Sequence, residues 1–176
     1  MRRFAKFPLY MGFSVLVVAV LYVSTQIGQQ NAINKPSKAS NTGANLSLLF
    51  TPPDLITVSM TSDKEVVGID VVVRYEKEKV TILPSTLNGI TPFIASGGVV
   101  DENSETFSFS AYNPNNSGVK SGMISKFNVR PNNPDQDLTS DLQFEVGEGQ
   151  TAAIEPTGKI NILNQSTGVN INIPHQ

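Results

Sequence analysis

The sequence predicts an all-β protein, a jelly-roll-like antiparallel β-sandwich of about nine strands preceded by one N-terminal transmembrane helix. From Leu46 onward, apolar residues alternate with polar ones in short stretches that Pro, Gly, Asn and Asp interrupt, which is typical of strands and turns. No amphipathic window long enough for a helix competes with them, although residues 84–94 could hold one helical turn. The first 28 residues, by contrast, have the composition of a membrane segment.

The chain begins with a positively charged group that an uncharged apolar stretch follows. Arg2, Arg3 and Lys6 precede residues 7–23, which contain no charged side chain. If the stretch is extended to residue 28, it is long enough to cross a bilayer as a helix, which takes about 20 residues. No small-x-small cleavage site follows, so we expect residues 1–28 to be an uncleaved signal anchor; a secretory signal that is removed is the alternative. The positive-inside rule then predicts a single-pass protein of the cell membrane whose C-terminal domain is extracytoplasmic.

A polar segment separates this anchor from the predicted sandwich. Residues 29–45 are rich in Asn, Gln, Ser and Ala and contain almost no large apolar side chain. Such a segment cannot bury enough surface to offset the entropy lost on ordering, so we expect a flexible linker. The sandwich domain then spans residues 46–176, about 130 residues, which suits a single domain with one core. Its candidate strands are residues 46–50, 55–60, 66–75, 80–83, 98–101, 106–112, 122–130, 138–146, 151–155 and 168–173.

Alternation assigns the side chains of two of these strands to opposite faces, because successive residues of a strand point in opposite directions. The inward set, expected to form a core between two sheets, is Ile69, Val71, Val73, Tyr75, Phe107, Phe109 and Ala111. The outward set is Gly68, Asp70, Val72, Arg74, Thr106, Ser108, Ser110 and Tyr112.

Three stretches carry a family resemblance. VVGIDVVVRYEKEKVTIL (66–83) has a Gly, alternating apolar residues, a Tyr and a second apolar run, ETFSFSAYNP (105–114) leads from an acidic turn into a Ser-Phe-Ser-Ala strand, and GMISKFNVRP (122–131) is a Gly-led alternating strand. Together they resemble the cohesin-like β-sandwich family, receptor modules known from cellulosomes and from other bacterial and archaeal surface proteins. A fourth stretch, AAIEPTGKINILNQSTGVNINI (152–173), is similar to the family's closing layout of strand, turn and final strand, so the resemblance spans most of residues 46–173. It departs from the family at Tyr75-Glu76-Lys77, where Tyr-Asp-Pro is usual, and at Gly68, where a larger polar residue is frequent.

The resemblance also implies where a partner binds. In cellulosomal cohesins the outward side of the strand at 66–75 helps form a flat face that accepts a dockerin, and an acidic residue there is a recurring contact. Asp70 occupies the matching place; a solvated surface carboxylate is the alternative interpretation of this residue. Arg74 shares the face and could pair with Asp70. The implied partner-binding residues are Asp70, Val72, Arg74, Ser108, Ser110 and Tyr112.

The composition excludes several other kinds of site. The chain has no Cys and a single His, His175, which is expected to be a frayed terminal residue, so thiol chemistry, Cys-ligated metals and His-based catalysis have no residues to use. The acidic turn at 101–105 lacks the order of a calcium loop and is expected to be solvated. A net charge of −2 with scattered basic residues predicts no nucleic-acid binding. We therefore expect no enzyme, no cofactor and no metal.

Three functions remain. The leading hypothesis is a membrane-anchored binding module that recognises a protein, dockerin-like or another cell-surface partner, through a sandwich face. A carbohydrate-binding module for a polysaccharide is the first alternative, although the chain has no Trp and Tyr112 is the one tyrosine expected on the domain surface. A structural component of the cell envelope is the second.

Overall fold

A computed structural model describes residues 43–158 and 160–175, and in these ranges the chain is all β. The signal anchor predicted for residues 7–28 and most of the predicted linker lie outside the described residues. Within the described ranges no helix is long and apolar enough to cross a bilayer.

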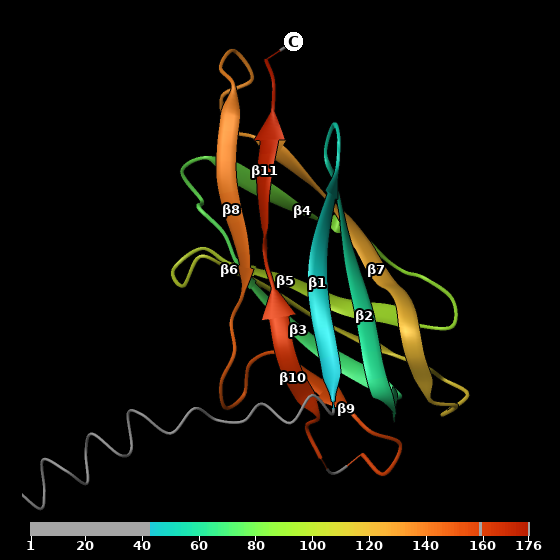
Figure 1. The fold of residues 1–176 in the computed structure, drawn as a ribbon. Coiled ribbons are helices and arrows are strands. Elements are labelled where there is room, and N and C mark those ends of the chain that lie inside the picture. The colour runs from blue at the N-terminus through green and yellow to red at the C-terminus, as the bar shows by residue number, and fades with distance from the viewer. Residues whose placement is uncertain (1–42, 159, 176) are drawn as a thin grey trace, which may run out of the picture. The chain divides into compact units, whose positions relative to one another are not determined.

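Eleven strands make up the described part of the chain (Figure 1). The ten candidate strands of the sequence correspond to ten of them. Their bounds are β1 Ala44–Thr51, β2 Leu55–Val66, β3 Gly68–Arg74, β4 Val80–Gly89, β5 Ile94–Asp101, β6 Thr106–Tyr112, β7 Val119–Pro131, β8 Leu138–Phe144, β9 Ala152–Ile154, β10 Leu163–Thr167 and β11 Val169–Ile173.

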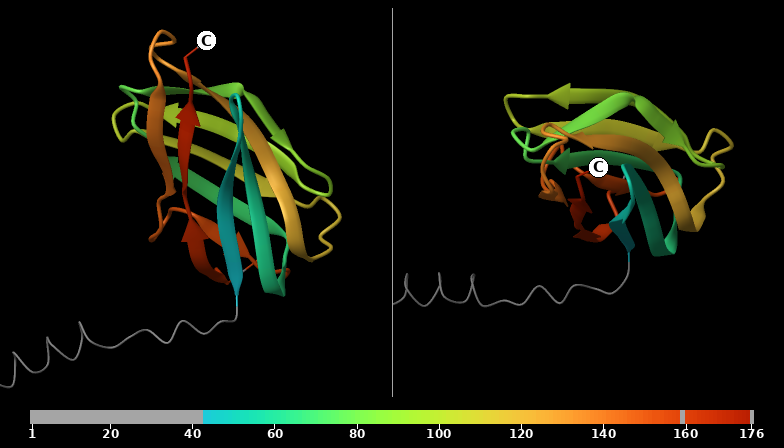
Figure 2. Two further views of the ribbon diagram at one scale, coloured as in Figure 1. Left: turned by 45° about the horizontal axis from the view of Figure 1, so that its top comes forward. Right: turned by 90° about the horizontal axis from the view of Figure 1, so that it is seen from above.

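The strands form two sheets that face each other. One sheet has the order β10-β1-β2-β7-β4, and the other has the order β11-β8-β3-β6-β5, with the short β9 pairing with one end of β3. Figure 1 shows β1, β2 and β7 side by side with β3, β5 and β6 behind them, and Figure 2 shows the same arrangement from two further sides. The predicted sandwich is therefore confirmed.

The core between the sheets contains the residues that alternation predicted. Every member of the predicted inward set of β3 and β6 is buried, and Tyr75, just after β3, is 4% exposed. Phe107 and Phe109 of β6 meet Phe127 of β7 in a cluster that joins the two sheets, with ring centroids 4.9 Å apart for Phe107 and Phe127. The inward facing of β3 and β6 is confirmed, and their opposite sides form an outer face of the six-stranded sheet.

The pairing differs from the sequence prediction in two places. β10 was not predicted, and it pairs parallel with β1, so the sandwich is not wholly antiparallel. The helical turn considered for residues 84–94 is wrong, because β4 continues through Pro84 to Gly89. Its pairing with β7 shifts register between Leu83 and Asn88, and such an irregularity is where a strand accommodates a proline.

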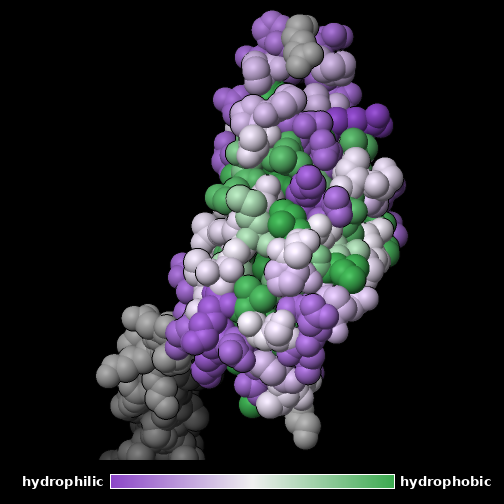
Figure 3. Space-filling model, turned by 90° about the vertical axis from the view of Figure 1, so that its right-hand side faces the viewer, coloured by the Kyte–Doolittle hydropathy of each residue, from purple (hydrophilic) through white to green (hydrophobic). Residues whose placement is uncertain are grey.

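Large hydrophobic side chains also reach the surface of the five-stranded sheet. Leu49 on β1 and Met123 on β7 are about half exposed. The side of the molecule drawn in Figure 3 shows hydrophobic residues scattered among hydrophilic ones in its middle, with hydrophilic residues at both ends. Singly placed hydrophobic residues of this kind are ordinary on a protein surface, so they mark no site by themselves.

Candidate functional site

The six predicted partner-binding residues all lie on the outer face of β3 and β6. The two strands are antiparallel neighbours in which Asp70 is opposite Ser110 and Val72 is opposite Ser108. Arg74 and Tyr112 lie at opposite ends of this face, because Arg74 is opposite Thr106 and Tyr112 is opposite Gly68. The structure thus brings four of the six together at the centre and places the other two at the ends.

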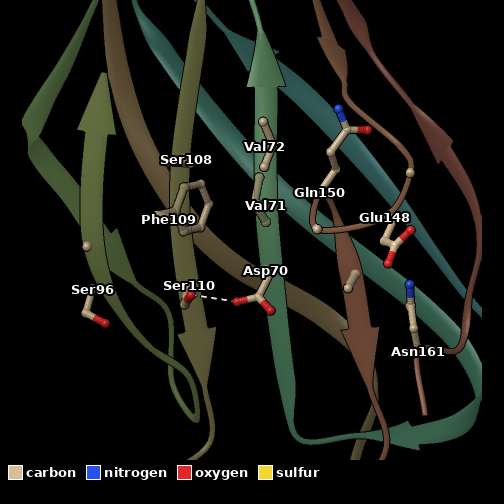
Figure 4. Close-up of a pocket in the computed structure, with 14 residues that line it drawn as sticks. Asp70, Val71, Val72, Ser96, Ser108, Phe109, Ser110, Glu148, Gln150 and Asn161 are labelled. Carbon is tan, nitrogen blue, oxygen red and sulfur yellow. Dashed lines mark hydrogen bonds between the residues drawn. The ribbon is translucent and has the colours of Figure 1, made fainter. Parts of the chain in front are cut away.

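Asp70 is held by its neighbour across the sheet. The Ser110 hydroxyl donates a hydrogen bond of 2.6 Å to Oδ1 of Asp70, which Figure 4 shows as a dashed line. Both side chains are exposed. The bond orients the carboxylate toward β6 while Oδ2 remains for another donor.

The sequence suggested that Arg74 could pair with Asp70, but in the structure it pairs with another residue. Its Nε forms an ion pair with Oε1 of Glu145, the residue that follows β8. The other oxygen of Glu145, Oε2, accepts a hydrogen bond of 3.1 Å from Nε2 of Gln150. Arg74 therefore belongs to a neutral network at the base of the segment 145–150, not to the centre of the face.

Strand β5 extends the face beyond the predicted residues. Ile94 lies opposite Tyr112, Ser96 opposite Ser110, and Val99 opposite Ser108. Ile94, Val99 and Tyr112 are each about half exposed. Three exposed apolar side chains on one side of one sheet give this face the mixed apolar and polar character of a protein-binding surface. Alternation could not have found Ile94 and Val99, because Ser96, Gly97 and Gly98 interrupt the pattern of β5.

A groove of about 600 Å³ crosses the middle of this face. Its floor includes Asp70, Val72, Ser108 and Ser110, four of the six predicted residues. Figure 4 shows Ser96 on one side of this floor and Glu148, Gln150 and Asn161 on the other. The segment 147–150 and residue 161 thus form one wall, and Ser96 with Gly97 forms the other; we call this the central groove.

Each wall contains a glycine with a left-handed backbone, Gly97 at an irregularity within β5 and Gly149 in the turn at 147–150. Gly97 and Gly149 have φ angles of 75° and 74°, in the left-handed region that glycine adopts without strain. Residues with a Cβ atom adopt that region at a cost of about 1–2 kcal/mol. The Gly-rich sequences around 97 and 147–149 are therefore the local sequence signal for the two walls, although they do not show where in the fold each wall lies.

Thr151 fixes the larger wall to the sheet. Its side chain is fully buried beside Val72. Thr151 Oγ1 accepts a hydrogen bond of 3.0 Å from the Val72 N–H and donates one of 3.1 Å to the Val72 carbonyl. The same carbonyl accepts the backbone N–H of Glu145 at 2.8 Å. The Thr151 hydroxyl thereby satisfies the backbone groups of Val72 in the gap between β8 and β9. The segment 145–150 is attached to β3 at one end by Glu145 and at the other by Thr151.

The remaining polar groups show no metal-binding geometry. Across residues 43–158 and 160–175, no group of three or more His, Asp or Glu side chains could hold an ion. In the acidic turn, Oδ1 of Asp101 accepts the backbone N–H groups of Asn103 at 2.9 Å and Ser104 at 3.4 Å, and hydrogen bonding from Ser104 and Asn103 lowers the pKa of Asp101. His175 is not free: its Nδ1 lies 2.7 Å from Oδ1 of Asp137, and these contacts lower the pKa of Asp137.

Comparison with known proteins places the fold. No protein-family model and no curated protein matches the sequence. A chain in the Coh-OlpC-Doc435 complex, a type I cohesin–dockerin complex from Clostridium thermocellum, matches with a TM-score of 0.57 and 12% identity, over 76% of this chain and 94% of that chain. A type II cohesin domain from the cellulosome of Acetivibrio cellulolyticus matches with a TM-score of 0.53 and 11% identity, over 74% of this chain and 95% of that chain. The chain has the cohesin fold.

The share of each solved chain that is matched shows how complete the structural likeness is. A cohesin module from a family 33 glycoside hydrolase of Clostridium perfringens matches with a TM-score of 0.54 and 11% identity, over 76% of this chain and 96% of that chain. These solved cohesins are therefore matched over nearly their full lengths. At such low identity the likeness concerns the cohesin fold alone, and what the groove binds must be argued from its own residues.

Proposed function

We propose that this domain is a non-catalytic protein-recognition module, and that its partner, dockerin-like or another cell-surface protein, docks on the outer face of β3, β6 and β5. The observation that carries the proposal is the composition of that face. Its floor is regular sheet, its centre is a polar groove, and Ile94, Val99 and Tyr112 expose apolar surface around it. Protein interfaces combine such apolar anchors with a few polar contacts.

The structural neighbours support the same kind of partner. The matched structures include complexes of cohesins with dockerins, among them a type I complex and a cohesin bound to a Cel5 dockerin mutant. A polysaccharide ligand has less support, because sugar sites use aromatic platforms and Tyr112 is the one exposed large aromatic residue among those described. A purely structural envelope component would not need a groove whose walls depend on two left-handed glycines and a buried threonine.

Tyr112→Ala should weaken binding to the partner by about tenfold or more, because a tyrosine that a partner buries in an interface often contributes more than 1 kcal/mol. Leu49→Ala is the matched control, since Leu49 is 48% exposed and Tyr112 is 47% exposed, but Leu49 lies on the five-stranded sheet. Biolayer interferometry against purified type I and type II dockerins, and against proteins captured from the source organism, measures both variants. Equal loss of binding in the two variants, or none in either, would contradict the proposed face.

We further propose that residues 7–28 anchor the protein in the cell membrane with the cohesin-fold domain on the extracytoplasmic side. The support is the uncharged stretch of residues 7–23 after Arg2, Arg3 and Lys6. Protease added to intact cells should remove the domain and leave a membrane-bound N-terminal fragment. Protection of the domain, or a mature chain that begins after residue 25, would contradict an uncleaved anchor with this orientation.

A further inference from the structure

We propose that the central groove binds an arginine side chain of the protein partner, held between Asp70 on the floor and Glu148 on the wall. This inference rests on the proposed function and names the chemistry that the groove selects. The two carboxylates come from different elements, Asp70 from β3 and Glu148 from the segment between β8 and β9. Figure 4 shows Asp70 in the middle of the floor and Glu148 to its right on the wall, with Asn161 below Glu148.

The groove carries negative charge that no lining residue compensates. Its fourteen lining residues include Asp70 and Glu148 and no Lys, Arg or His. Arg74, the cation on the outer face of β3, is bound to Glu145 and so is already neutralised. Asp101 on β5, opposite Thr106, adds a further carboxylate to the same face. A complementary partner surface must therefore be cationic where it meets the groove.

The neutral groups of the groove favour arginine over lysine. Ser96, Ser108 and Ser110 offer hydroxyl oxygens, and Gln150 and Asn161 offer amide oxygens, around the two carboxylates. A guanidinium has five N–H donors in a planar fork and can bind a carboxylate through two parallel hydrogen bonds while the remaining donors reach other acceptors. An ammonium is a compact point charge with three donors and stronger hydration. A groove about 600 Å³ in volume also admits the planar group with its aliphatic stem.

Existing contacts leave the groove ready for such a group. Ser110 donates to Oδ1 of Asp70, which orients that carboxylate without using Oδ2. Glu148 sits between Gly147 and Gly149, on a wall that Thr151 and the Glu145–Gln150 hydrogen bond hold in place. The Asp70 carboxylate is therefore oriented before the partner arrives, and the backbone that carries Glu148 is held beside it, which reduces the entropy lost on binding.

The test is an NMR titration of the ¹⁵N-labelled full chain in detergent micelles with N-acetylarginine N′-methylamide. The neutral isostere N-acetylcitrulline N′-methylamide controls for shape, and the corresponding lysine derivative controls for charge. Saturable shifts are expected at Asp70, Ser96, Ser110 and Glu148 with the arginine compound, weaker ones with lysine and none with citrulline. Added salt should reduce them, because exposed charges are screened.

Asp70→Asn and Glu148→Gln should each weaken arginine binding about tenfold, since each removes a charged hydrogen-bond acceptor. Asp135→Asn, which changes an exposed carboxylate outside the groove, is the matched control and should leave binding unchanged. Unshifted core resonances verify that each variant is folded. Equal response to arginine and citrulline, or arginine shifts that do not depend on Asp70 and Glu148, would overturn the inference.

The same variants separate this inference from the proposed function. If the groove ignores arginine while Tyr112→Ala still weakens binding to the partner, the arginine site is wrong and protein recognition stands. If arginine binds the groove but Tyr112→Ala, Asp70→Asn and Glu148→Gln all leave partner binding unchanged, the groove binds arginine and the proposed docking face is wrong.

Discussion

Replacing Val71 with aspartate is expected to unfold the sandwich. Val71 is 1% exposed in the middle of β3 and lies opposite Phe109 of β6. An aspartate there would bury a carboxylate among apolar side chains with no partner, which costs several kcal/mol of the about 5–15 kcal/mol by which a domain is stable. Urea unfolding of residues 41–176, which form one compact unit, should show no cooperative transition in this variant.

Asp70→Ala is the control, because it changes the adjacent residue on the opposite side of the strand. Asp70 is exposed and makes one side-chain hydrogen bond, with Ser110. Its replacement should change the free energy of unfolding by about 0.5 kcal/mol or less, as at an ordinary surface position. If the Val71→Asp variant still showed a cooperative unfolding transition and the Asp70→Ala variant did not, β3 would face the opposite way.

Phe127→Ala should be the most damaging truncation in the core. Phe127 is fully buried on β7, and its ring centroid lies 4.9 Å from that of Phe107 and 6.3 Å from that of Phe109. Truncation removes one member of the cluster that joins the sheets and leaves a cavity, which typically costs about 3–5 kcal/mol. The urea midpoint should fall accordingly, with an unchanged slope.

Two other variants serve as references for the loss of unfolding free energy in Phe127→Ala. Phe127→Leu keeps most of the volume and should cost clearly less than the alanine variant. Leu49→Ala removes a half-exposed side chain from the opposite surface of the five-stranded sheet and should cost little. If Phe127→Ala costs no more than Leu49→Ala, the aromatic cluster does not hold the two sheets together.

The sequence predicted best where alternation was longest. β6 alternates between polar and apolar residues, and in β3 the charged residues Asp70 and Arg74 mark the outward side although Val72 there is apolar. The facing of Val71 and Phe109 could therefore be read from the order of residues alone. Because facing also decides which side chains point outward, the same pattern predicted Asp70, Val72, Ser108 and Ser110 on one surface. Four residues that line the groove were therefore predictable from local order.

Pairing over long distances in sequence was not predictable in the same way. The residues of β10 are mostly polar and show no alternation, and its parallel partner β1 lies more than a hundred positions earlier in the chain. β4 continues past Pro84 because β7 supplies its partner, whereas the local sequence indicates a turn. In both cases tertiary contacts override local preference.

The walls of the groove were missed for a related reason. Gly147 and Gly149 predict a turn, but the position of that turn beside Asp70 depends on β8 and β9 sharing the edge of β3. Glu148 has no sequence signal that distinguishes it from any exposed glutamate. The residues of the groove floor could be predicted from strand alternation, whereas the residues of the wall depend on how β8 and β9 pair with β3.

The double hydrogen bond of Thr151 to Val72 has a consequence for how such a protein can diverge. Because Thr151 and the Glu145 N–H carry the attachment to β3, residues 146–150 contribute little to the sheet itself. Surface segments of this kind accept substitutions, insertions and deletions at small cost to folding. Descendants of one ancestral domain could therefore exchange this short segment and acquire new partners, while selection for a stable sandwich acts on other parts of the chain.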